Sequence, residues 1–225
     1  TAPLQKLAYM GPMFRYERPQ AGRQRQFHQI GVEVLGTHMP EADAETIALA
    51  LDIYKGVGLT GTRLKINSIG YPKRRDSYRA AVGEYFGDRI EKLCPDCKRR
   101  MERNVFRVLD CKVEACRELI SEVPAIDEYL CGECRDHFAR VVELLEALGI
   151  EYAKEKFLVR GLDYYTKTVY EFAHSALGAR DAVGGGGRYD DLVEELGGPP
   201  TGAVGFSIGG EATLLALKGS VLTLC

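Results

Sequence analysis

Alternation of apolar and polar residues marks the two ends of the chain, whereas helical spacing marks its middle. Near the N-terminus, residues 4–18 and 26–35 read as two strands, the second of which contains the β-branched alternation of "QIGVEVLG". Pro19 and Gly22 punctuate the segment between them, so we expect a loop there. "TRLKINSIG" (62–70) reads as a further strand, and the N-terminal third therefore favours a sheet.

Helical spacing is clearest in two segments. In the first, residues 43–54, Ile47, Leu51 and Tyr54 share one face. The second ends at Gly149, a usual C-terminal residue of helices, and its apolar face is made of Phe138, Val141, Val142, Leu145 and Leu148. The whole stretch from about 71 to 150 is charge-rich, mostly helical in pattern, and holds six of the seven cysteines.

Strand patterns return after Glu151. "TKTVYEF" alternates, "AVGFSIGG" is an apolar strand, "EATLLALK" is a closing helix, and "AVGGGGRYDDL" reads as a glycine turn that leads into a short helix. The order predicts an α+β fold, a mainly antiparallel sheet flanked by helices and interrupted by a helical insertion. We place the first part of the domain at 1–70, the insertion at 71–153 and the second part at 154–225.

The composition is that of an ordinary globular protein, with 45% apolar and 28% charged residues. A formal net charge of −2 argues against a protein that coats nucleic acid through an overall positive charge, but it allows a local basic patch. No run approaches about 18 apolar residues, so we expect no membrane span, and no signal-peptide pattern is visible. Seven cysteines cannot all pair within the chain, which favours a reducing, cytoplasmic setting.

The segment "FRYERPQAGRQRQFHQ" (14–29) carries a cluster of arginines at positions 15, 18, 23 and 25. Guanidinium groups are planar, permanently charged and bidentate, which suits phosphate oxygens, and Phe27 could stack on a base. The alternative is a solvated loop in which the arginines pair with Glu17 and other acids.

Two further stretches offer candidate ligand groups. In "LVRGLDYYTKTVYEF" (158–172), Arg160 stands at a probable strand end near the hydroxyls of Tyr164 and Tyr165. A buried arginine needs an anion, which is either a carboxylate or phosphate ligand or an internal partner such as Asp163. "VGGGGRYDDL" (183–192) allows a sharp turn or a close approach to a ligand; taken alone it favours a hairpin turn, and it lacks the Lys-Ser/Thr pair of a phosphate loop.

One motif is excluded by the order of the chain. "GFSIG" (205–209) matches the G-x-S-x-G nucleophile elbow of α/β-hydrolases, a fold in which an acid and then a histidine follow the serine. Here all four histidines precede Ser207 and no Asp follows it. The hydrolase interpretation therefore fails.

The cysteines form two CxxC motifs, "CPDC" and "CGEC", with Cys111 and Cys116 between them. Paired CxxC motifs are typical of tetrahedral zinc, although this gap exceeds the usual spacing. The predicted structural zinc would be bound by Cys94, Cys97, Cys131 and Cys134. Packed or surface thiols are the alternative, and a thioredoxin-like redox role lacks the βαβ pattern that it needs.

Taken in order, these motifs resemble those of class II aminoacyl-tRNA synthetases. "FRYE" with "RQRQF" looks like their motif 2, and "GFSIGGEATLLAL" occupies the place of motif 3. "LVRGLDYYTKTVYEF" and "GGGGRYDDL" look like two stretches peculiar to histidyl-tRNA synthetases. The resemblance covers nearly the whole chain and implies the class II synthetase-like fold.

The resemblance implies how ATP would be held. Arg15 would grip the α-phosphate and Glu17 would contact the adenine side. Arg23 would contact the outer phosphates, and Phe27 would stack on adenine. Arg160 would stand near the α-phosphate in the charge-neutralising role that a metal ion fills elsewhere, so Arg15 and Arg160 would carry catalysis.

The resemblance also implies a histidine pocket. Gln29 and Glu33, at alternate positions of one strand, would face the substrate, and Glu33 suits its α-amino group. The remaining lining residues would be Arg160, Tyr164, Tyr165 and Tyr189.

The implied reaction is histidine activation by ATP with Mg²⁺, followed by transfer to tRNA(His). The helical stretch resembles the family's insertion, which lies against the tRNA acceptor stem. Phosphates could meet its basic residues, Lys92, Lys98, Arg99, Arg100, Arg103 and Arg107. An acid-balanced, solvated helix face is the alternative, and full-length members are expected to be homodimers.

The chain departs from the family pattern in two ways. It begins almost at motif 2, so motif 1, a threonine-bearing histidine loop and the anticodon-binding domain are not part of it. Motif 3 normally reads Glu-Arg, whereas here Glu211 is followed by Ala212. That arginine would sandwich the adenine and meet the γ-phosphate, so its loss could cost several kcal/mol of transition-state stabilisation.

Two other classes remain open at this stage. One is a non-catalytic regulatory subunit that partners ATP phosphoribosyltransferase in histidine biosynthesis. The missing motif 3 arginine favours it, and the intact Arg15 and Arg160 oppose it, because a histidine sensor has no need of an ATP clamp. The other is a zinc-bearing RNA-binding module, which would bind RNA without ATP.

Overall fold

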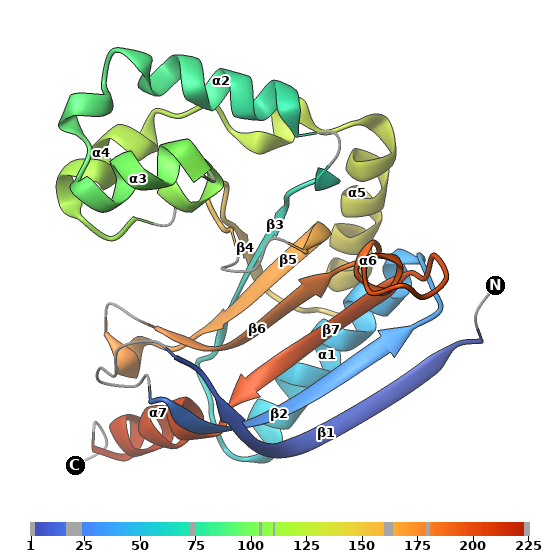
Figure 1. Ribbon diagram of the computed structural model, residues 1–225. Helices are drawn as coiled ribbons and strands as arrows, with labels where there is room; N and C mark the ends of the chain where they lie inside the picture. Colours follow the sequence, from blue (N-terminus) through green and yellow to red (C-terminus); the bar gives the residue numbers. More distant parts are fainter. Residues whose placement is uncertain are drawn as a thin grey trace.

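A seven-stranded sheet forms the centre of the molecule (Figure 1). The computed structural model describes residues 3–16, 24–72, 75–103, 105–109, 111–159, 164–178 and 181–222. The strands are β1 (Gln5–Phe14), β2 (Gln26–Leu35), β3 (Arg63–Ser68), β4 (Tyr152–Lys154), β5 (Thr166–Ala173), β6 (Ala182–Arg188) and β7 (Ala203–Gly209). Their order is β1-β2-β7-β6-β5-β3-β4, and only β3 and β4 pair in parallel, which confirms the predicted mainly antiparallel α+β fold.

The helices are α1 (Pro40–Gly56), α2 (Asp76–Gly87), α3 (Pro95–Arg103), α4 (Glu114–Ser121), α5 (Gly132–Ala147), α6 (Leu192–Glu195) and α7 (Gly210–Leu222). Four single-turn helices, η2 (Ile90–Lys92), η3 (Val105–Val108), η4 (Ile126–Tyr129) and η5 (Ser175–Leu177), complete the described elements. The predicted helices 43–54 and the one ending before Gly149 correspond to α1 and α5, and Gly149 has φ +66°, as expected of a helix-terminating glycine.

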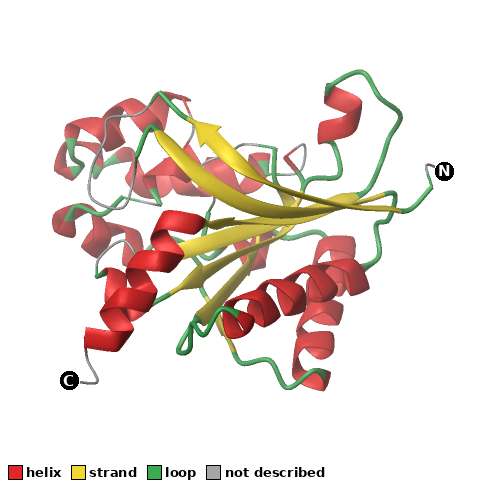
Figure 2. Ribbon diagram, turned by 90° about the horizontal axis from the view of Figure 1, so that it is seen from below, coloured by secondary structure: helices red, strands yellow, loops and turns green. Residues whose placement is uncertain are grey.

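Long helices pack on one face of the sheet, where the larger core lies (Figure 2). Ile47 of α1 and Val141 and Leu145 of α5 are fully buried there against strand residues such as Ile66 and Phe172. The predicted apolar stripes of both helices therefore face this core, except for Leu148, which is 57% exposed. Burying each large apolar side chain stabilises the fold by about 1.5–3 kcal/mol.

A second core lies within the helical stretch α2–η4 and reaches the sheet. Tyr78, Val82 and Phe86 of α2 are almost fully buried in it, together with Val169 of β5. Tyr170 and Phe172, in the same strand, belong to the larger core. β5 is thus shared by both cores, which fixes the helical lobe against the sheet. The domain limits drawn from the sequence stay a prediction.

The glycine run was predicted as a turn, and that prediction is wrong: residues 182–188 form strand β6, between β5 and β7. A β-carbon on Gly184 would lie 2.3 Å from the Tyr54 hydroxyl, and one on Gly186 would lie 2.1 Å from the carbonyl oxygen of Gly205. The glycines therefore serve close packing around a central strand rather than chain reversal.

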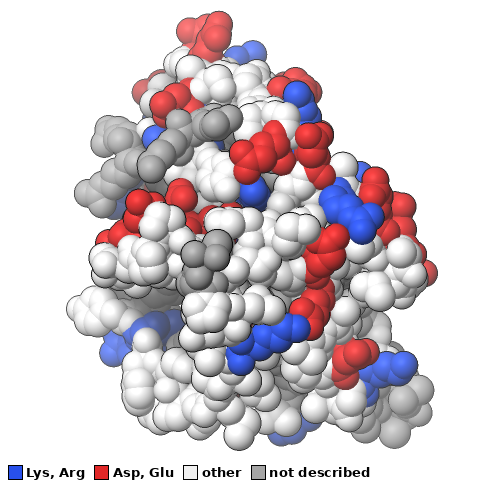
Figure 3. Space-filling view, turned by 90° about the vertical axis from the view of Figure 1, so that its right-hand side faces the viewer, with Lys and Arg blue, Asp and Glu red and all other residues white. Residues whose placement is uncertain are grey.

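Charged side chains of both signs are interspersed over the face shown in Figure 3. Ion pairs join neighbouring elements, for example Arg140 of α5 with Glu41 of α1 at 3.3 Å. Within the described part of the chain, no helix is long and apolar enough to cross a membrane.

Candidate active site

Strand β2 divides its side chains between the core and the opposite face of the sheet. Ile30, Val32 and Val34 belong to or pack against the larger core. Because successive side chains of a strand point to opposite faces, Gln29 and Glu33 lie on the face away from the core helices. β2 thus carries the two predicted substrate-facing residues on one surface.

Glu33 meets Tyr189 on this face. The Tyr189 hydroxyl, from the residue directly after β6, donates a hydrogen bond to the Glu33 carboxylate. Burial raises the pKa of Glu33, and the hydrogen bond from Tyr189 opposes that rise. Burial and the neighbouring carboxylate raise the pKa of Tyr189, which keeps its hydroxyl protonated as the donor.

Aromatic rings surround this pair. The ring centroids of Tyr164 and Tyr165 lie 4.7 Å apart, and those of Tyr164 and Tyr189 lie 5.8 Å apart. The structure therefore brings together Glu33, Tyr164, Tyr165 and Tyr189, four of the residues that the resemblance implies for the histidine pocket. Gln29 lies on the same face, and its side-chain nitrogen donates to the Ser207 hydroxyl at 3.3 Å.

Sequence reasoning missed Tyr9 of β1. Its ring lies over Gly31, where a β-carbon would be 2.1 Å from it. Gly31 and Glu33 stand at alternate positions of β2, so Tyr9 lies on the same face of the sheet as Glu33. Burial, followed by the charges of Glu33 and Tyr165, raises the pKa of Tyr9. The alternating pattern of β1 could have indicated a tyrosine facing the site, but not the cross-strand contact with a glycine.

Glycines on neighbouring strands make room for these large side chains. A β-carbon on Gly205, which pairs with Glu33 across β2 and β7, would lie 1.8 Å from the Glu33 carboxylate. One on Gly187 would lie 2.8 Å from the Tyr165 ring. The polar and aromatic side chains thus pack directly against the backbone of β2, β6 and β7, where glycines leave room for them.

The end of β1 carries the predicted phosphate-binding residues. The Arg15 guanidinium lies over the Phe27 ring, 4.1 Å from its centroid, and Arg15 Nε donates to the carbonyl oxygen of Gln24 at 2.7 Å. This cation–π contact brings the predicted phosphate and adenine residues together. Glu17, Arg23 and Arg160 lie outside the described residues.

The start of α7 is attached to β2. The Glu211 carboxylate accepts a hydrogen bond from the backbone N–H of His28 at 2.9 Å and contacts His28 Nδ1 at 2.9 Å. Burial alone would raise the pKa of Glu211, but the contacts with His28 outweigh burial and lower it. Ser207 lies within the extended strand β7, so "GFSIG" forms no strand-to-helix elbow.

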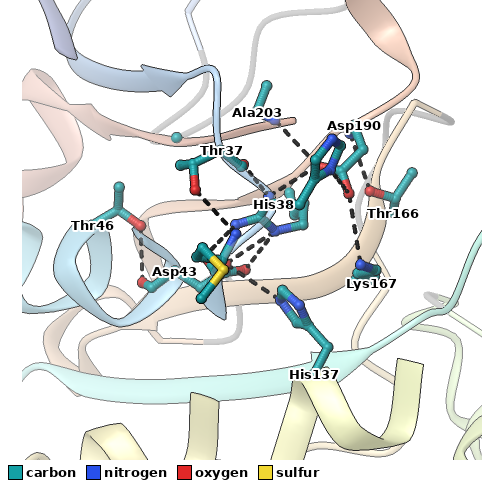
Figure 4. A network of polar contacts seen from close by, with 12 residues as sticks. Thr37, His38, Asp43, Thr46, His137, Thr166, Lys167, Asp190 and Ala203 are labelled. Carbon is teal, nitrogen blue, oxygen red and sulfur yellow. Dashed lines mark hydrogen bonds and ion pairs between the residues drawn. The ribbon is translucent and has the colours of Figure 1, made fainter. Parts of the chain in front are cut away.

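A buried ion network lies beneath the site (Figure 4). Arg188, which is 0% exposed, donates to Asp43 at 3.0 Å and to Asp190 at 2.9 Å, and it also binds the carbonyl oxygens of Thr37 and Met39. Burial alone would raise the pKa of Asp43, but Arg188 and His137 outweigh it and hold the pKa below its usual value.

The network fixes both neighbours of Tyr189. Asp190 accepts a hydrogen bond from the backbone N–H of Ala203 at 3.1 Å, and its own N–H donates to Thr166. Because Tyr189 lies between Arg188 and Asp190, these contacts set the backbone from which its hydroxyl reaches Glu33. From the sequence alone, the tripeptide Arg188-Tyr189-Asp190 gave no indication that its charged residues position the tyrosine.

Among the described residues, the structure groups only two of the four predicted zinc ligands, Cys94 and Cys97. The ligand atoms of Cys94 and Cys97 lie within 4.8 Å of those of Cys111 and Cys116. Cys131 and Cys134 instead line a small cavity with residues that include Tyr71 and Arg75. The two CxxC motifs stand at the starts of different helices, α3 and α5. Tyr78 and Ile126 of the second core line the cavity of Cys131 and Cys134, whereas the other four cysteines form a separate group.

The chain is similar in sequence to known proteins. The sequence model described as Histidyl-tRNA synthetase matches residues 2–74 and 89–212. The histidine–tRNA ligase of Natranaerobius thermophilus is 53% identical over 220 residues, which are 97% of this chain and 52% of that protein. The histidine–tRNA ligase of Aquifex aeolicus is 53% identical over 215 residues, 96% of this chain and 53% of that protein.

Two solved structures are similar to the chain in fold. The apo histidyl-tRNA synthetase of S. aureus has a TM-score of 0.73 and 37% identity, covering 96% of this chain and 51% of that one. A Bacillus halodurans protein titled as an ATP phosphoribosyltransferase regulatory subunit/histidyl-tRNA synthetase has a TM-score of 0.61 and 26% identity, covering 94% and 57%. The chain thus spans about half the length of the curated relatives that it matches.

Proposed function

The chain belongs to the histidyl-tRNA synthetase family, and we propose that it forms the part of the enzyme in which histidine is activated by ATP. The observation that carries the proposal is the hydrogen-bonded pair of Glu33 and Tyr189, enclosed by tyrosines over a floor of glycines. This site offers a carboxylate for an ammonium group and hydroxyls and ring faces for an imidazole.

Glu33 would bind the α-ammonium group of histidine. The ligand's positive charge would lower the pKa that burial raises, so the bound complex would hold Glu33 as a carboxylate. Tyr189 would keep that carboxylate oriented through its hydroxyl. The rings of Tyr164 and Tyr165 would enclose the imidazole.

ATP, accompanied by Mg²⁺ as part of the substrate, would lie toward Arg15 and Phe27. Arg15 would contact the α-phosphate, and Phe27 would stack on the adenine once the guanidinium that now covers it turns to the phosphate. From the resemblance, Glu17, Arg23 and Arg160 would complete the ATP contacts.

In the reaction, an oxygen of the histidine carboxylate forms a bond to the α-phosphorus while the bond from that phosphorus to the β-phosphate oxygen breaks. Pyrophosphate leaves with the bonding electrons, and histidyl-adenylate remains. Fixed arginines stabilise the negative charge that builds on the phosphoryl oxygens, and holding the reactants in line lowers the barrier further.

The second step would transfer histidine to tRNA(His), with the helical lobe near the acceptor stem. Two of its basic residues are already paired with acids of the lobe, Lys98 with Glu91 and Arg99 with Asp96. These two pairs favour the solvated-face alternative at their own positions. A homodimer and a cytoplasmic setting stay predictions from the family and the cysteine usage.

Histidine-dependent ATP–pyrophosphate exchange tests the proposal. We expect exchange with histidine and not with other amino acids, and its loss in Arg160→Ala. Histidine that shifts the melting temperature without supporting exchange would favour a histidine sensor of the regulatory-subunit kind. Absence of both effects would contradict the proposed function.

A further inference from the structure

Four cysteine side chains meet in the helical lobe. Cys94 and Cys97 flank the start of α3, Cys111 follows η3, and Cys116 lies in α4. Their sulfur atoms all lie within 4.8 Å of one another, although Cys97 and Cys111 are separated by residues 98–110. Three separate elements therefore direct thiols to a single point.

The spacing of the sulfur atoms fits a tetrahedral ion. A Zn–S bond of about 2.3 Å implies sulfurs about 3.8 Å apart in a regular tetrahedron. Cys94 Sγ and Cys111 Sγ lie 3.9 Å apart. A disulfide needs about 2.05 Å, so this pair is not bonded as it stands.

Surrounding groups match thiolate ligands. The backbone N–H of Cys94 donates to Cys116 Sγ at 3.2 Å, the kind of contact by which outer-shell donors orient and stabilise a metal-bound sulfur. Cys97 and Cys116 are 0% exposed and Cys111 is 7% exposed, so solvent has little access to the centre of the group. All four positions of a tetrahedron would be filled by protein sulfurs, which is typical of structural sites.

The charge of the segment is also complementary. One Zn²⁺ with four thiolates carries a net charge of −2. The segment 94–116 contains six basic and four acidic residues, an excess of two positive charges that matches it. Basic groups near such a site offset its charge.

The helices of the lobe are short, so a cross-link between them would stabilise the lobe. α3 has 9 residues and α4 has 8, and helices shorter than about 12 residues are marginal on their own. Small units of this kind are commonly held by disulfides or a metal, whose binding free energy becomes folding free energy.

We propose that Cys94, Cys97, Cys111 and Cys116 bind one structural Zn²⁺ that joins α3, η3 and α4. Binding releases the four thiol protons and involves no change of oxidation state. The same hydrophobic cluster contains Tyr165, and Tyr164 and Tyr189 pack against it, so the metal also supports one wall of the candidate pocket.

The matched control is provided by the second CxxC motif. Zinc content of purified protein is measured for the wild type, for Cys111→Ser with Cys116→Ser, and for Cys131→Ser with Cys134→Ser. We expect one zinc per chain in the wild type and in the Cys131/Cys134 variant, and loss of zinc in the Cys111/Cys116 variant. Equal zinc in all three proteins, or none in the wild type, would overturn the proposal.

A second measurement does not depend on folding of a variant. Wild-type protein, stripped of metal under reducing conditions, is titrated with Co²⁺, which in a tetrahedral tetrathiolate site gives intense d–d and sulfur-to-metal absorption. We expect saturation at one equivalent, displacement by Zn²⁺, and a rise in melting temperature. Recovery of the four cysteines as disulfides, or a Co²⁺ spectrum of oxygen ligands only, would contradict a zinc site.

Discussion

Glu33 is proposed to bind the substrate's ammonium group, and its burial also affects the stability of the fold. A carboxyl group that is largely buried beside tyrosines has a raised pKa because its charged form loses solvation. Folding therefore favours the protonated form of Glu33 relative to the unfolded chain. The stabilising contribution is complete at low pH and is lost as the pH rises through the folded-state pKa.

Glu33→Gln is therefore predicted to stabilise the free protein while weakening histidine binding. Gln cannot ionise, so it keeps the neutral form at all pH values. We expect a gain in melting temperature of about 1–2 °C at pH 7.5, roughly 0.5 kcal/mol for a chain of this size. Thermal scans against pH should show the gain disappearing in acid, and a melting temperature that falls at neutral pH would contradict the assignment.

The second prediction at the level of single residues concerns Ala212. It follows Glu211, which is bonded to the backbone of β2, and it occupies the place of an arginine in the family pattern. We predict that Ala212→Arg raises the rate of pyrophosphate exchange by about tenfold or more, since it restores a cation for adenine and the γ-phosphate. Ala212→Lys is the control for charge alone, and an unchanged rate in both variants would contradict this view of motif 3.

Among the elements, β6 and β7 depend on glycine for close packing. Gly205→Ala would place a β-carbon 1.8 Å from the Glu33 carboxylate and 2.5 Å from the Val32 carbonyl oxygen. We predict a loss of about 1–3 kcal/mol of stability together with weaker histidine binding.

Gly83→Ala in α2 is the matched control, because nothing lies within 4 Å of its β-carbon position. There the helix propensity of Ala should stabilise the protein by up to about 1 kcal/mol. Urea denaturation of both variants separates the two effects, and equal stabilities would contradict the packing argument.

The buried ion network joins α1, β6 and the loop before α1. Arg188→Met would leave Asp43 and Asp190 without their main partner, and we predict a loss of about 3–5 kcal/mol. Arg140→Met, which removes exposed pairs only, should cost less than about 1 kcal/mol. Chemical denaturation measures both, and similar losses would argue against the structural role of Arg188.

The pH dependence of the network follows from Asp43. Its pKa is lowered in the folded protein, so its ion pair contributes fully above the unfolded value of about 3.9 and is lost as the pH falls through the folded pKa. In Arg188→Met, burial is no longer offset by the guanidinium, so the pKa of Asp43 rises. The stability difference between wild type and Arg188→Met should therefore be largest at neutral pH and shrink continuously as the pH falls. A difference that is unchanged below pH 3 would contradict the assignment.

The sequence predicted elements better than it predicted contacts. The alternation in 26–35 and the helical stripe that ends before Gly149 reflect local periodicity, and both elements formed as expected. The glycine run was misjudged because its cause is the packing of Tyr54, Phe206 and Tyr165 from distant segments. The partners of Arg188 and the set of four cysteines likewise depend on tertiary arrangement that spacing cannot show.

For the whole molecule, the shared strand β5 links the helical lobe to the sheet. Val169 lies in the core of the lobe, whereas Tyr170 and Phe172 lie in the core between sheet and helices. Tyr164 and Tyr165, just before β5, belong to the candidate histidine site. This candidate site therefore lies where the two cores meet, and its shape depends on both.

Calorimetric titration with a non-hydrolysable histidyl-adenylate analogue, the histidyl sulfamoyl adenosine, tests the central claim most directly. The alanyl analogue, which keeps every group except the imidazole, is the control ligand, and Glu33→Gln is the control variant. We predict that the histidyl analogue binds at least about 100-fold more tightly than the alanyl one, and that Glu33→Gln weakens both. Equal affinity for the two analogues, or no effect of Glu33→Gln, would contradict a histidine pocket at this site.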